Sequence, residues 1–144
     1  MNLFGMLEVS GSALSAERWR AEVVSSNMAN AETTRTPQGG AYRRQLVVFH
    51  ARPAARFPML LAGLRTAAAP GVRVDRVVAD ASPLPRRYEP GHPDADGAGY
   101  VNYPNVNPVM EMTDLLSAVR AYQLNAAAVQ ATKSMLQQSL QILS

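Results

Sequence analysis

The chain has 144 residues, of which 47% are hydrophobic and only 6% aromatic, with no cysteine and a net charge of +3. This length suits a single domain, and the absence of cysteine excludes disulfides, thiolate nucleophiles and cysteine-ligated zinc. No run approaches the roughly 18 apolar residues of a membrane helix, and the N-terminus lacks the basic stretch and apolar core of a secretory signal. If the protein leaves the cytoplasm, we expect a route other than general secretion.

The positive charge is confined to the middle of the chain. Residues 1–34 have a net charge of −2, residues 35–100 combine ten arginines with five acidic residues, and residues 109–144 are balanced. All ten prolines lie between Pro37 and Pro108. Because proline interrupts helices, the two ends of the chain are predicted to form long helices and the middle to form other structure.

Residues 3–31 are predicted to be the first helix. Apolar residues recur along it at heptad spacing, which favours a seam that packs against a second helix. Ser10 and Glu17 interrupt this pattern. The residues assigned to the N-terminal assembly seam are Leu7, Leu14, Ala21, Val24 and Met28.

The middle of the chain is predicted to contain two short strands and an extended arm. Tyr42–His50 and Val72–Ala79 are rich in β-branched and aromatic residues that partly alternate with polar ones, which is typical of strands. Residues 51–70, rich in alanine and proline, are predicted to be a loop. Turn-forming residues occur throughout residues 82–108, so we expect a hairpin-like arm there.

The last helix is predicted to run from Pro108 to residue 143. Asn107 can accept hydrogen bonds from the exposed N–H groups at the helix start, and Pro108 has the φ angle of a first helical residue. Glu111 and Asp114 suit the positive end of the helix dipole. Such a helix is roughly 50 Å long, and apolar residues follow a 3-4 spacing along it with one interruption. The residues assigned to the C-terminal assembly seam are Met112, Leu115, Val119, Tyr122, Ala126, Val129, Leu136, Leu140 and Leu143.

His92, Asp94 and Asp96 are close together in the sequence, and Asp94-Ala-Asp96-Gly97 resembles the start of a calcium-binding loop. An EF-hand loop needs glycine at its sixth position and glutamate at its twelfth. Counted from Asp94, Gly97 is fourth and the twelfth residue is Asn105. The spacing therefore excludes an EF-hand and favours a hairpin turn near Asp96-Gly97. We expect neither a metal nor a cofactor.

No pattern typical of a catalytic site is present, since there is no nucleophile elbow, glycine-rich phosphate loop or histidine-rich zinc spacing. His50 ends an apolar run and is interpreted as a surface residue at a strand end. The ten middle arginines leave open a small basic nucleic-acid-binding module, although a solvated or subunit-facing surface is favoured. A small enzyme is a second alternative, which would need a cavity with a perturbed acid or base. Lys133 either buries its aliphatic stem in the seam or faces a carboxylate of a partner.

Three stretches resemble the flagellar basal-body rod protein family, and within it the subunits of the proximal rod. Ser26–Thr33 is similar to the SNxANAxT signature that follows the first helix in rod and hook proteins. Tyr42–Phe49 resembles the segment after that signature, and Tyr88–Asn125 resembles the arm and the start of the last helix; residues 51–70 match nothing in the family. The residues that carry the family signature are Asn27, Ala29, Asn30, Thr33, Tyr100, Pro104, Asn105 and Tyr122.

The resemblance implies a structural subunit, not an enzyme, in the periplasmic rod of the bacterial flagellar basal body. It implies export through the flagellar type III apparatus without a cleavable signal peptide. It also implies assembly into a helical tubular axial structure that transmits torque and forms part of the export channel. The implied partners are copies of the chain, other proximal rod subunits, the adaptor between the rod and the membrane ring, and the distal rod protein. Neither nucleic acid nor direct membrane insertion is implied.

Residue patterns and resemblance together predict a mainly α fold with a small β-rich middle. The expected organisation is an N-terminal helix over residues 1–34, a β-rich middle domain with an extended arm over residues 35–107, and a C-terminal helix over residues 108–144. We expect the two helices to pair as a coiled coil in the inner layer of the assembly, with the middle domain and arm projecting outward.

Overall fold

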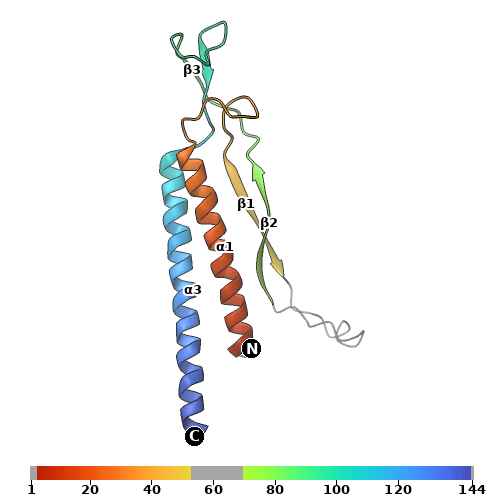
Figure 1. The fold of residues 1–144 in the computed structure, drawn as a ribbon, viewed down its shortest axis with the longest axis vertical. Helices are drawn as coiled ribbons and strands as arrows, with labels where there is room; N and C mark the ends of the chain where they lie inside the picture. The colour runs from red at the N-terminus through yellow and green to blue at the C-terminus, as the bar shows by residue number, and fades with distance from the viewer. Residues whose placement is uncertain (1–2, 53–69, 144) are drawn as a thin grey trace, which may run out of the picture.

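The protein is an elongated pair of long helices with one β-hairpin along its side and a second at one end (Figure 1). The structure is a computed structural model that describes residues 3–52 and 70–143. In chain order the elements are α1 (Leu3–Ala29), β1 (Gln45–Arg52), β2 (Gly71–Ala79), β3 (Arg86–Tyr88), β4 (Tyr100–Asn102) and α3 (Pro108–Leu143). The prediction of a mainly α fold with a small β-rich middle is confirmed.

Helix α1 lies between α3 and the β1–β2 hairpin and contacts both of them (Figure 1). The two helices run antiparallel, because Asn27 near the end of α1 is bonded to Glu111 near the start of α3. The arm formed by β3 and β4 lies beyond this end of the helix pair, and both chain termini lie at the other end (Figure 1). None of the helices in the described part of the chain is long and apolar enough to span a membrane.

Local capping explains where the helices begin and end. Helix α3 begins where predicted, since the Asn107 side-chain oxygen accepts hydrogen bonds from the backbone nitrogens of Val109 (3.0 Å) and Met110 (3.4 Å). Helix α1 ends two residues earlier than predicted, because the chain turns at Asn30. The carbonyl oxygen of Asn30 accepts a bond from the Thr33 nitrogen at 3.1 Å, which closes that turn.

Strands β1 and β2 pair antiparallel from one end to the other, with one register shift between Val48 and Phe49 that leaves Asp75 unpaired in the register. β1 begins three residues later than expected, because the backbone nitrogens of Tyr42 and Arg44 donate to Thr33 and Asn105 rather than to β2. Ala51, the first residue of the expected loop, and the residue after it belong to β1. Residues 53–69 of that loop lie outside the described residues.

The β1–β2 hairpin approaches α1 closely at Gly71. A Cβ atom on Gly71 would lie 2.6 Å from the Ser12 hydroxyl oxygen, so a side chain there would displace that hydroxyl. The same hydroxyl accepts a hydrogen bond from the Val72 nitrogen at 3.1 Å. The glycine therefore permits a direct bond between helix and hairpin.

The arm is closed by the turn predicted near Asp96-Gly97. The Asp96 nitrogen donates to the Tyr100 carbonyl oxygen at 2.8 Å, and the Gly99 nitrogen donates to the Asp96 carbonyl oxygen at 2.9 Å. Backbone hydrogen bonds from Tyr100 and Ala98 to the Asp96 carboxylate, with the charge of a nearby arginine, hold the pKa of Asp96 below its usual range. Gly99 has a φ of 81°, which favours glycine.

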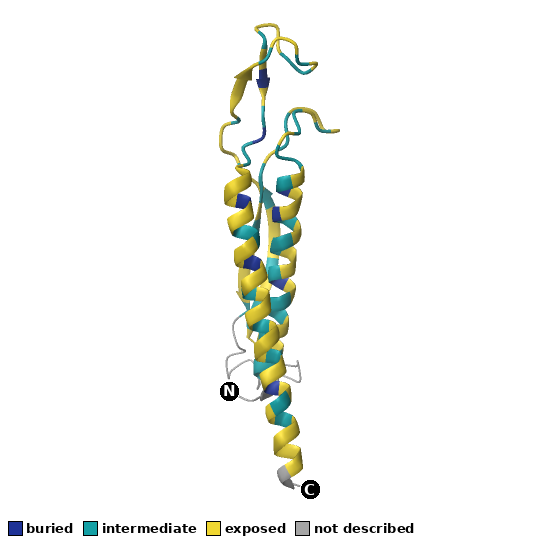
Figure 2. Cartoon of the chain, turned by 90° about the vertical axis from the view of Figure 1, so that its left-hand side faces the viewer, coloured by how far each residue is buried: buried dark blue, intermediate teal, exposed yellow. Residues whose placement is uncertain are grey.

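The helix pair buries very few aliphatic side chains within the described part of the chain (Figure 2). Those that are buried are Ala16, Val24 and Ala118, while Val101 is buried in β4 of the arm. Three polar residues, Asn27, Glu111 and Thr132, are buried with them. Because buried apolar surface is the main favourable term in folding, so small a core makes a separate subunit marginally stable.

We expect the helices of the isolated subunit to exchange their amide hydrogens rapidly, since helices in water depend on tertiary contacts. Protection should be weakest where α3 runs past the start of α1 and should rise toward Asn27 and Glu111, whose bond joins the helices. Hydrogen exchange followed by mass spectrometry on a verified monomer measures this gradient. Strong and uniform protection of both helices would contradict it.

Candidate assembly surface

Asn27 joins α1 to the start of β1 and to α3. Its side-chain amide is 1% exposed and makes four hydrogen bonds. The nitrogen donates to the Gln45 carbonyl oxygen and to Glu111 Oε2, both at 2.9 Å, and the oxygen accepts from the Tyr42 hydroxyl and the Gln45 backbone nitrogen, both at 2.9 Å. An amide can make four such bonds, so every polar atom of this buried side chain is satisfied.

Glu111 is fully buried beside Asn27 and forms an ion pair with Arg44. Its Oε1 accepts a hydrogen bond from Arg44 Nε at 2.6 Å. The same guanidinium donates to Asp114 at 3.1 Å, and Arg20 of α1 donates to the other oxygen of Asp114 at 3.3 Å. Two arginines and two carboxylates therefore connect α1, α3 and the start of β1. We call Arg20, Tyr42, Arg44, Asn27, Glu111 and Asp114 the polar junction.

The other polar residues of the SNxANAxT signature shape the turn after α1. Asn30 donates from its side chain to the Ser26 carbonyl oxygen at 2.9 Å and accepts from the Thr33 hydroxyl at 3.2 Å. The next residue, Thr34, donates from its hydroxyl to Asp94 in the arm at 2.7 Å. Ala29 is exposed at the end of α1. The signature residues therefore hold the turn after α1, and Thr34 joins that turn to the arm.

The signature residues of the arm and of α3 have different environments. Asn105 accepts a bond from the Arg44 backbone nitrogen at 2.8 Å, which ties the arm base to the polar junction. Pro104 is buried. Tyr100 lies 5.3 Å, centroid to centroid, from Tyr88. Tyr122 is 44% exposed on α3.

Asp94 and Asp96, whose sequence resembles the start of a calcium-binding loop, bond to other residues of the chain. Asp94 accepts from the hydroxyl of Thr34 and lies 3.5 Å from Arg35, while Asp96 accepts from Arg86 at 2.5 Å. His92 Nδ1 accepts a bond from the Asp94 nitrogen at 3.1 Å. Within residues 3–52 and 70–143, no three His, Asp or Glu side chains are grouped as metal ligands.

The basic middle does not form one free arginine patch in the described residues. Six of its arginines instead contact carboxylates, carbonyl oxygens or tyrosine rings of the same chain. The arginines with such contacts are Arg35, Arg43, Arg44, Arg73, Arg86 and Arg87. His50 lies near the end of β1 and is exposed, as expected for a strand-end surface residue.

The residues of the predicted C-terminal seam are divided between two faces of α3. Leu115, Val129 and Leu136 are half-buried. The remaining members with described side chains are exposed, and they are Met112, Val119, Tyr122, Ala126 and Leu140. The side chain of Leu143 lies outside the described ones.

A different row of α3 residues continues the face on which Glu111 meets Asn27. Its members recur every seven residues, are buried or half-buried, and are Glu111, Ala118, Asn125 and Thr132. Met112, Val119 and Ala126 directly follow Glu111, Ala118 and Asn125 in the sequence and form an adjacent row on the helix. This adjacent row is exposed. We call Met112, Val119, Ala126 and Leu140 the outer row.

The residues of the predicted N-terminal seam point into the molecule. Val24 is 6% exposed, and Leu7, Leu14, Ala21 and Met28 are half-buried. Since α1 has α3 on one side and the β1–β2 hairpin on the other, both sides of this helix are used within the chain.

Sequence reasoning missed the polar junction as a site. The sequence patterns relate Glu111 only to the helix dipole, and they place Tyr42 and Arg44 in a predicted strand. A signal was present, because Glu111 precedes Leu115 by four residues and Ala118 by seven, which places a carboxylate on the same helix face as two small or apolar residues. Its partner Arg44 is 67 positions away in the chain, so local periodicity could not reveal it.

Two family models of flagellar basal-body rod proteins match the two parts of the chain that contain the long helices. The model described as "Flagella basal body rod protein" matches residues 7–35, which include most of α1 and the signature turn. The model described as "Flagellar basal body rod FlgEFG protein C-terminal" matches residues 98–142, which include β4 and nearly all of α3.

Relatives that match over nearly the full length identify the family more specifically than the two family models do. The chain is 43% identical over 150 residues to the flagellar basal-body rod protein FlgC of Borreliella burgdorferi, with 99% of each chain covered. It is 41% identical over 148 residues to the FlgC protein of Bacillus subtilis, again with 99% of each covered, and 39% identical over 140 residues to that of Escherichia coli O157:H7, with 97% covered. The chain belongs to the FlgC family of flagellar basal-body rod proteins.

This membership makes the protein a structural subunit of the flagellar basal-body rod and not an enzyme. The expected family is confirmed, and the nucleic-acid-binding alternative is set aside. As a rod protein of the basal body, the chain assembles with other rod components.

Proposed function

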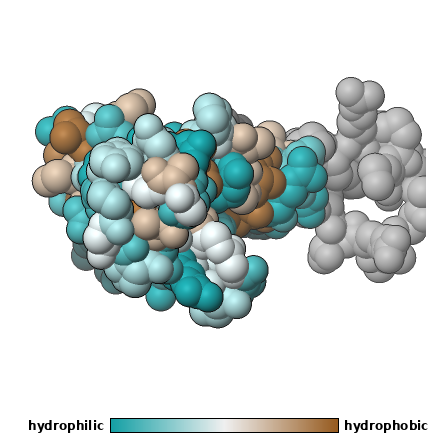
Figure 3. Space-filling model, turned by 90° about the horizontal axis from the view of Figure 1, so that it is seen from above, coloured by the Kyte–Doolittle hydropathy of each residue, from teal (hydrophilic) through white to brown (hydrophobic). Residues whose placement is uncertain are grey.

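We propose that the chain is a subunit of the proximal rod that assembles through its terminal helices into a helical tube. The main observation in support is that the subunit buries few apolar residues and leaves large apolar residues exposed on its helices. Only three aliphatic side chains of the helices, Ala16, Val24 and Ala118, are buried in the described residues, while Leu140 remains 67% exposed and Met112 53% exposed. Apolar surface of this kind marks protein–protein contacts, and hydrophobic residues reach the surface beside hydrophilic ones in the view from the arm end (Figure 3).

Within one subunit, α1 and α3 pair as a coiled coil. The supporting feature is the 4-3 spacing of the α3 face next to α1, which is the period of a left-handed coiled coil. Its members are Glu111, Leu115, Ala118, Tyr122, Asn125, Val129, Thr132 and Leu136. The proposed organisation is an N-terminal part over residues 1–34, which contains α1, a middle domain and arm over residues 35–107, and a C-terminal part over residues 108–144, which contains α3.

Between subunits, the outer row is the C-terminal assembly seam. A repeated contact between this row and a different surface of the next subunit generates an open helical array. Leu115, Val129 and Leu136 border both faces, so they support the helix pair and the neighbouring contact together. The rigid α1–α3 pair, held by the polar junction, is the element that transmits torque.

The remaining face of α3 suits the wall of an export channel. From Gln123 onward it carries neutral polar or small side chains, with Lys133 the one charged residue in the last 24 residues of the chain. Residues spaced along this face are Gln123, Ala127, Gln130, Ser134 and Gln141. A neutral polar wall offers passing polypeptides neither strong charge attraction nor apolar adhesion.

The proposed partners are copies of the chain, other proximal rod subunits, the adaptor between rod and membrane ring, and the distal rod protein. The proposed location is the periplasmic part of the basal body, reached through the flagellar type III export apparatus with the N-terminal region retained. The targeting information then lies in residues 1–14, of which residues 1–2 lie outside the described part.

We expect purified basal bodies to contain the chain with residues 1–14 intact. Cells that lack their own subunit and express this chain should swim, and mass spectrometry of their basal bodies should identify the N-terminal peptide. Absence of the chain from basal bodies of swimming cells would refute the rod assignment. A mature N-terminus beyond residue 14 would refute only the uncleaved export signal.

A further inference from the structure

A pocket of about 210 Å³ lies between α1 and the β1–β2 hairpin. Helix α1 contributes Ser12, Ser15 and Trp19 to its wall, and the hairpin contributes Arg52 at the end of β1 and Arg73 in β2. Among the described residues, no aspartate or glutamate lines it. The charged groups of this pocket are therefore all positive.

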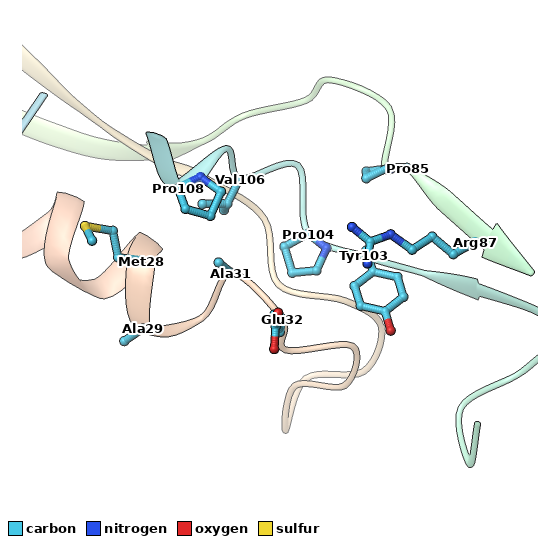
Figure 4. A pocket seen from close by; sticks show the side chains of 10 residues that line it. All are labelled: Met28, Ala29, Ala31, Glu32, Pro85, Arg87, Tyr103, Pro104, Val106 and Pro108. Carbon is cyan, nitrogen blue, oxygen red and sulfur yellow. The ribbon is translucent and has the colours of Figure 1, made fainter. Parts of the chain in front are cut away.

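The pocket between the end of α1 and the base of the arm has a different charge pattern (Figure 4). Both Glu32 and Arg87 line it, so it presents charges of both signs. The Arg87 guanidinium already has a partner, since it lies 4.4 Å from the centre of the Tyr103 ring. Of these two pockets, only the one beside the hairpin has an excess of positive charge.

Arg52 brings to the hairpin pocket a hydrogen-bond donor that has no acceptor. Its Nε is buried and makes no hydrogen bond. Its guanidinium forms no ion pair within residues 3–52 and 70–143. Buried N–H groups in native proteins are almost always hydrogen-bonded, so this nitrogen marks the place of an acceptor from outside the subunit.

Arg73 is held only weakly by its own chain. Its Nη2 lies 3.7 Å from a carboxylate oxygen of Asp75, and the two side chains are 56% and 36% exposed. Ion pairs in contact with solvent contribute little to stability, so Arg73 is free to bind a stronger partner. Two guanidinium groups at one pocket repel each other, and an anion between them removes this repulsion.

The acidic residues of the chain itself do not supply that anion. Residues 53–69, which lie outside the described part, contain neither aspartate nor glutamate. Nine of the eleven acidic residues of the chain have a hydrogen bond or an ion pair within it. The other two are Glu8, which does not line this pocket, and Glu32, which lies beyond the end of α1.

We propose that this pocket binds an acidic side chain of another rod protein, with its carboxylate between Arg52 and Arg73. Guanidinium groups bind carboxylates through charge-assisted and often paired hydrogen bonds. Trp19 is 51% exposed and offers an apolar surface to the aliphatic part of a glutamate. The pocket volume is several times the roughly 30 Å³ of one water molecule, which suits a single side chain.

The partner is a different rod component rather than a second copy of the chain. Residues 35–100 of every copy combine ten arginines with five acidic residues. Because like charges across an interface are unfavourable, this basic middle favours an acidic partner over another copy of itself. The contact requires only that the chain assembles with other rod components, and it does not depend on the outer row.

Carbodiimide cross-linking tests this contact with little background, because the reagent joins amines to adjacent carboxylates and Lys133 is the only lysine of the chain. Arg52→Lys places an amine in the pocket. Basal bodies that contain this variant should yield a cross-linked product in which residue 52 is joined to an aspartate or glutamate of another rod protein, identified by mass spectrometry. The matched control is Arg76→Lys, at an exposed hairpin position outside the pocket, and should yield only the products of the unmodified chain.

Intact basal bodies without the Arg52→Lys product would overturn the contact and leave the rod assignment in place. A product joined to a second copy, or to Asp75 of the same chain, would overturn the proposed occupant. Charge reversal gives an independent measurement. Arg52→Glu should reduce the swimming zone in soft agar at least twofold, whereas Arg76→Glu should match the unmodified chain. If Arg52→Lys yields no basal bodies, this comparison decides, and equal zones for the two reversals would overturn the proposal.

Discussion

Replacing Glu111 with alanine should lower the free energy of unfolding by about 3 kcal/mol, because removing one partner of a buried ion pair leaves the other charge uncompensated. The carboxylate is fully buried, and its loss leaves Arg44 Nε and one Asn27 N–H without their acceptor. A chain with so few buried aliphatic residues has little stability to lose. Urea unfolding followed by far-ultraviolet circular dichroism measures the change, and the variant should already lose much of its helical signal in buffer.

Two variants separate this effect from general loss of charge. Glu22→Ala also removes a glutamate from an ion pair with an arginine, but the Arg18 and Glu22 side chains are 76% and 53% exposed. Its cost should stay below about 0.5 kcal/mol. Glu111→Gln keeps an acceptor for Asn27 while losing the charge opposite Arg44, so its cost should lie between the two. Equal costs for Glu111→Ala and Glu22→Ala would mean that the polar junction does not hold the helices together.

The parts of the fold that depend on neighbouring residues could be predicted from the sequence. Helix α3 begins where Asn107 and Pro108 indicated, because capping is a local interaction. The turn near Asp96 was predicted for the same reason, since its hydrogen bonds join residues within four positions. The start of β1 was predicted too early because Arg44 bonds to Asn105, which is 61 residues away.

The choice between two faces of α3 could not be made from periodicity alone. The row containing Leu115, Val129 and Leu136 lies between two other rows of α3. Combined with either the row of Glu111 and Ala118 or the row of Met112 and Val119, it gives a 3-4 spacing. Apolar content favoured the row of Met112 and Val119. In the structure the inward row instead contains Glu111, whose partners lie on α1 and before β1. Long-range polar bonds and the small size of Ala118 decide the face, and neither is visible in a count of apolar residues.

Replacing Val119 with aspartate should abolish rod assembly while leaving the subunit folded and exported. Val119 is already 41% exposed in the single chain, and substitutions at such sites usually change stability by less than about 0.5 kcal/mol. In the assembled rod, the change removes a buried valine worth roughly 1.5–3 kcal/mol and adds the cost of desolvating an unpaired carboxylate. Each repeated contact should weaken by about tenfold or more.

Ser117→Asp is the matched control, because it adds the same charge to the same turn of α3. Ser117 is exposed, and a step of two residues places it about 200° round the helix from Val119, away from the outer row. Both variants should be secreted in equal amounts, since neither touches the polar junction or residues 1–14. Cells with Ser117→Asp should swim, whereas cells with Val119→Asp should lack rods in electron micrographs of their basal bodies. If both variants support swimming equally, the outer row is not the assembly interface, and the contact must lie on another face of the helix pair.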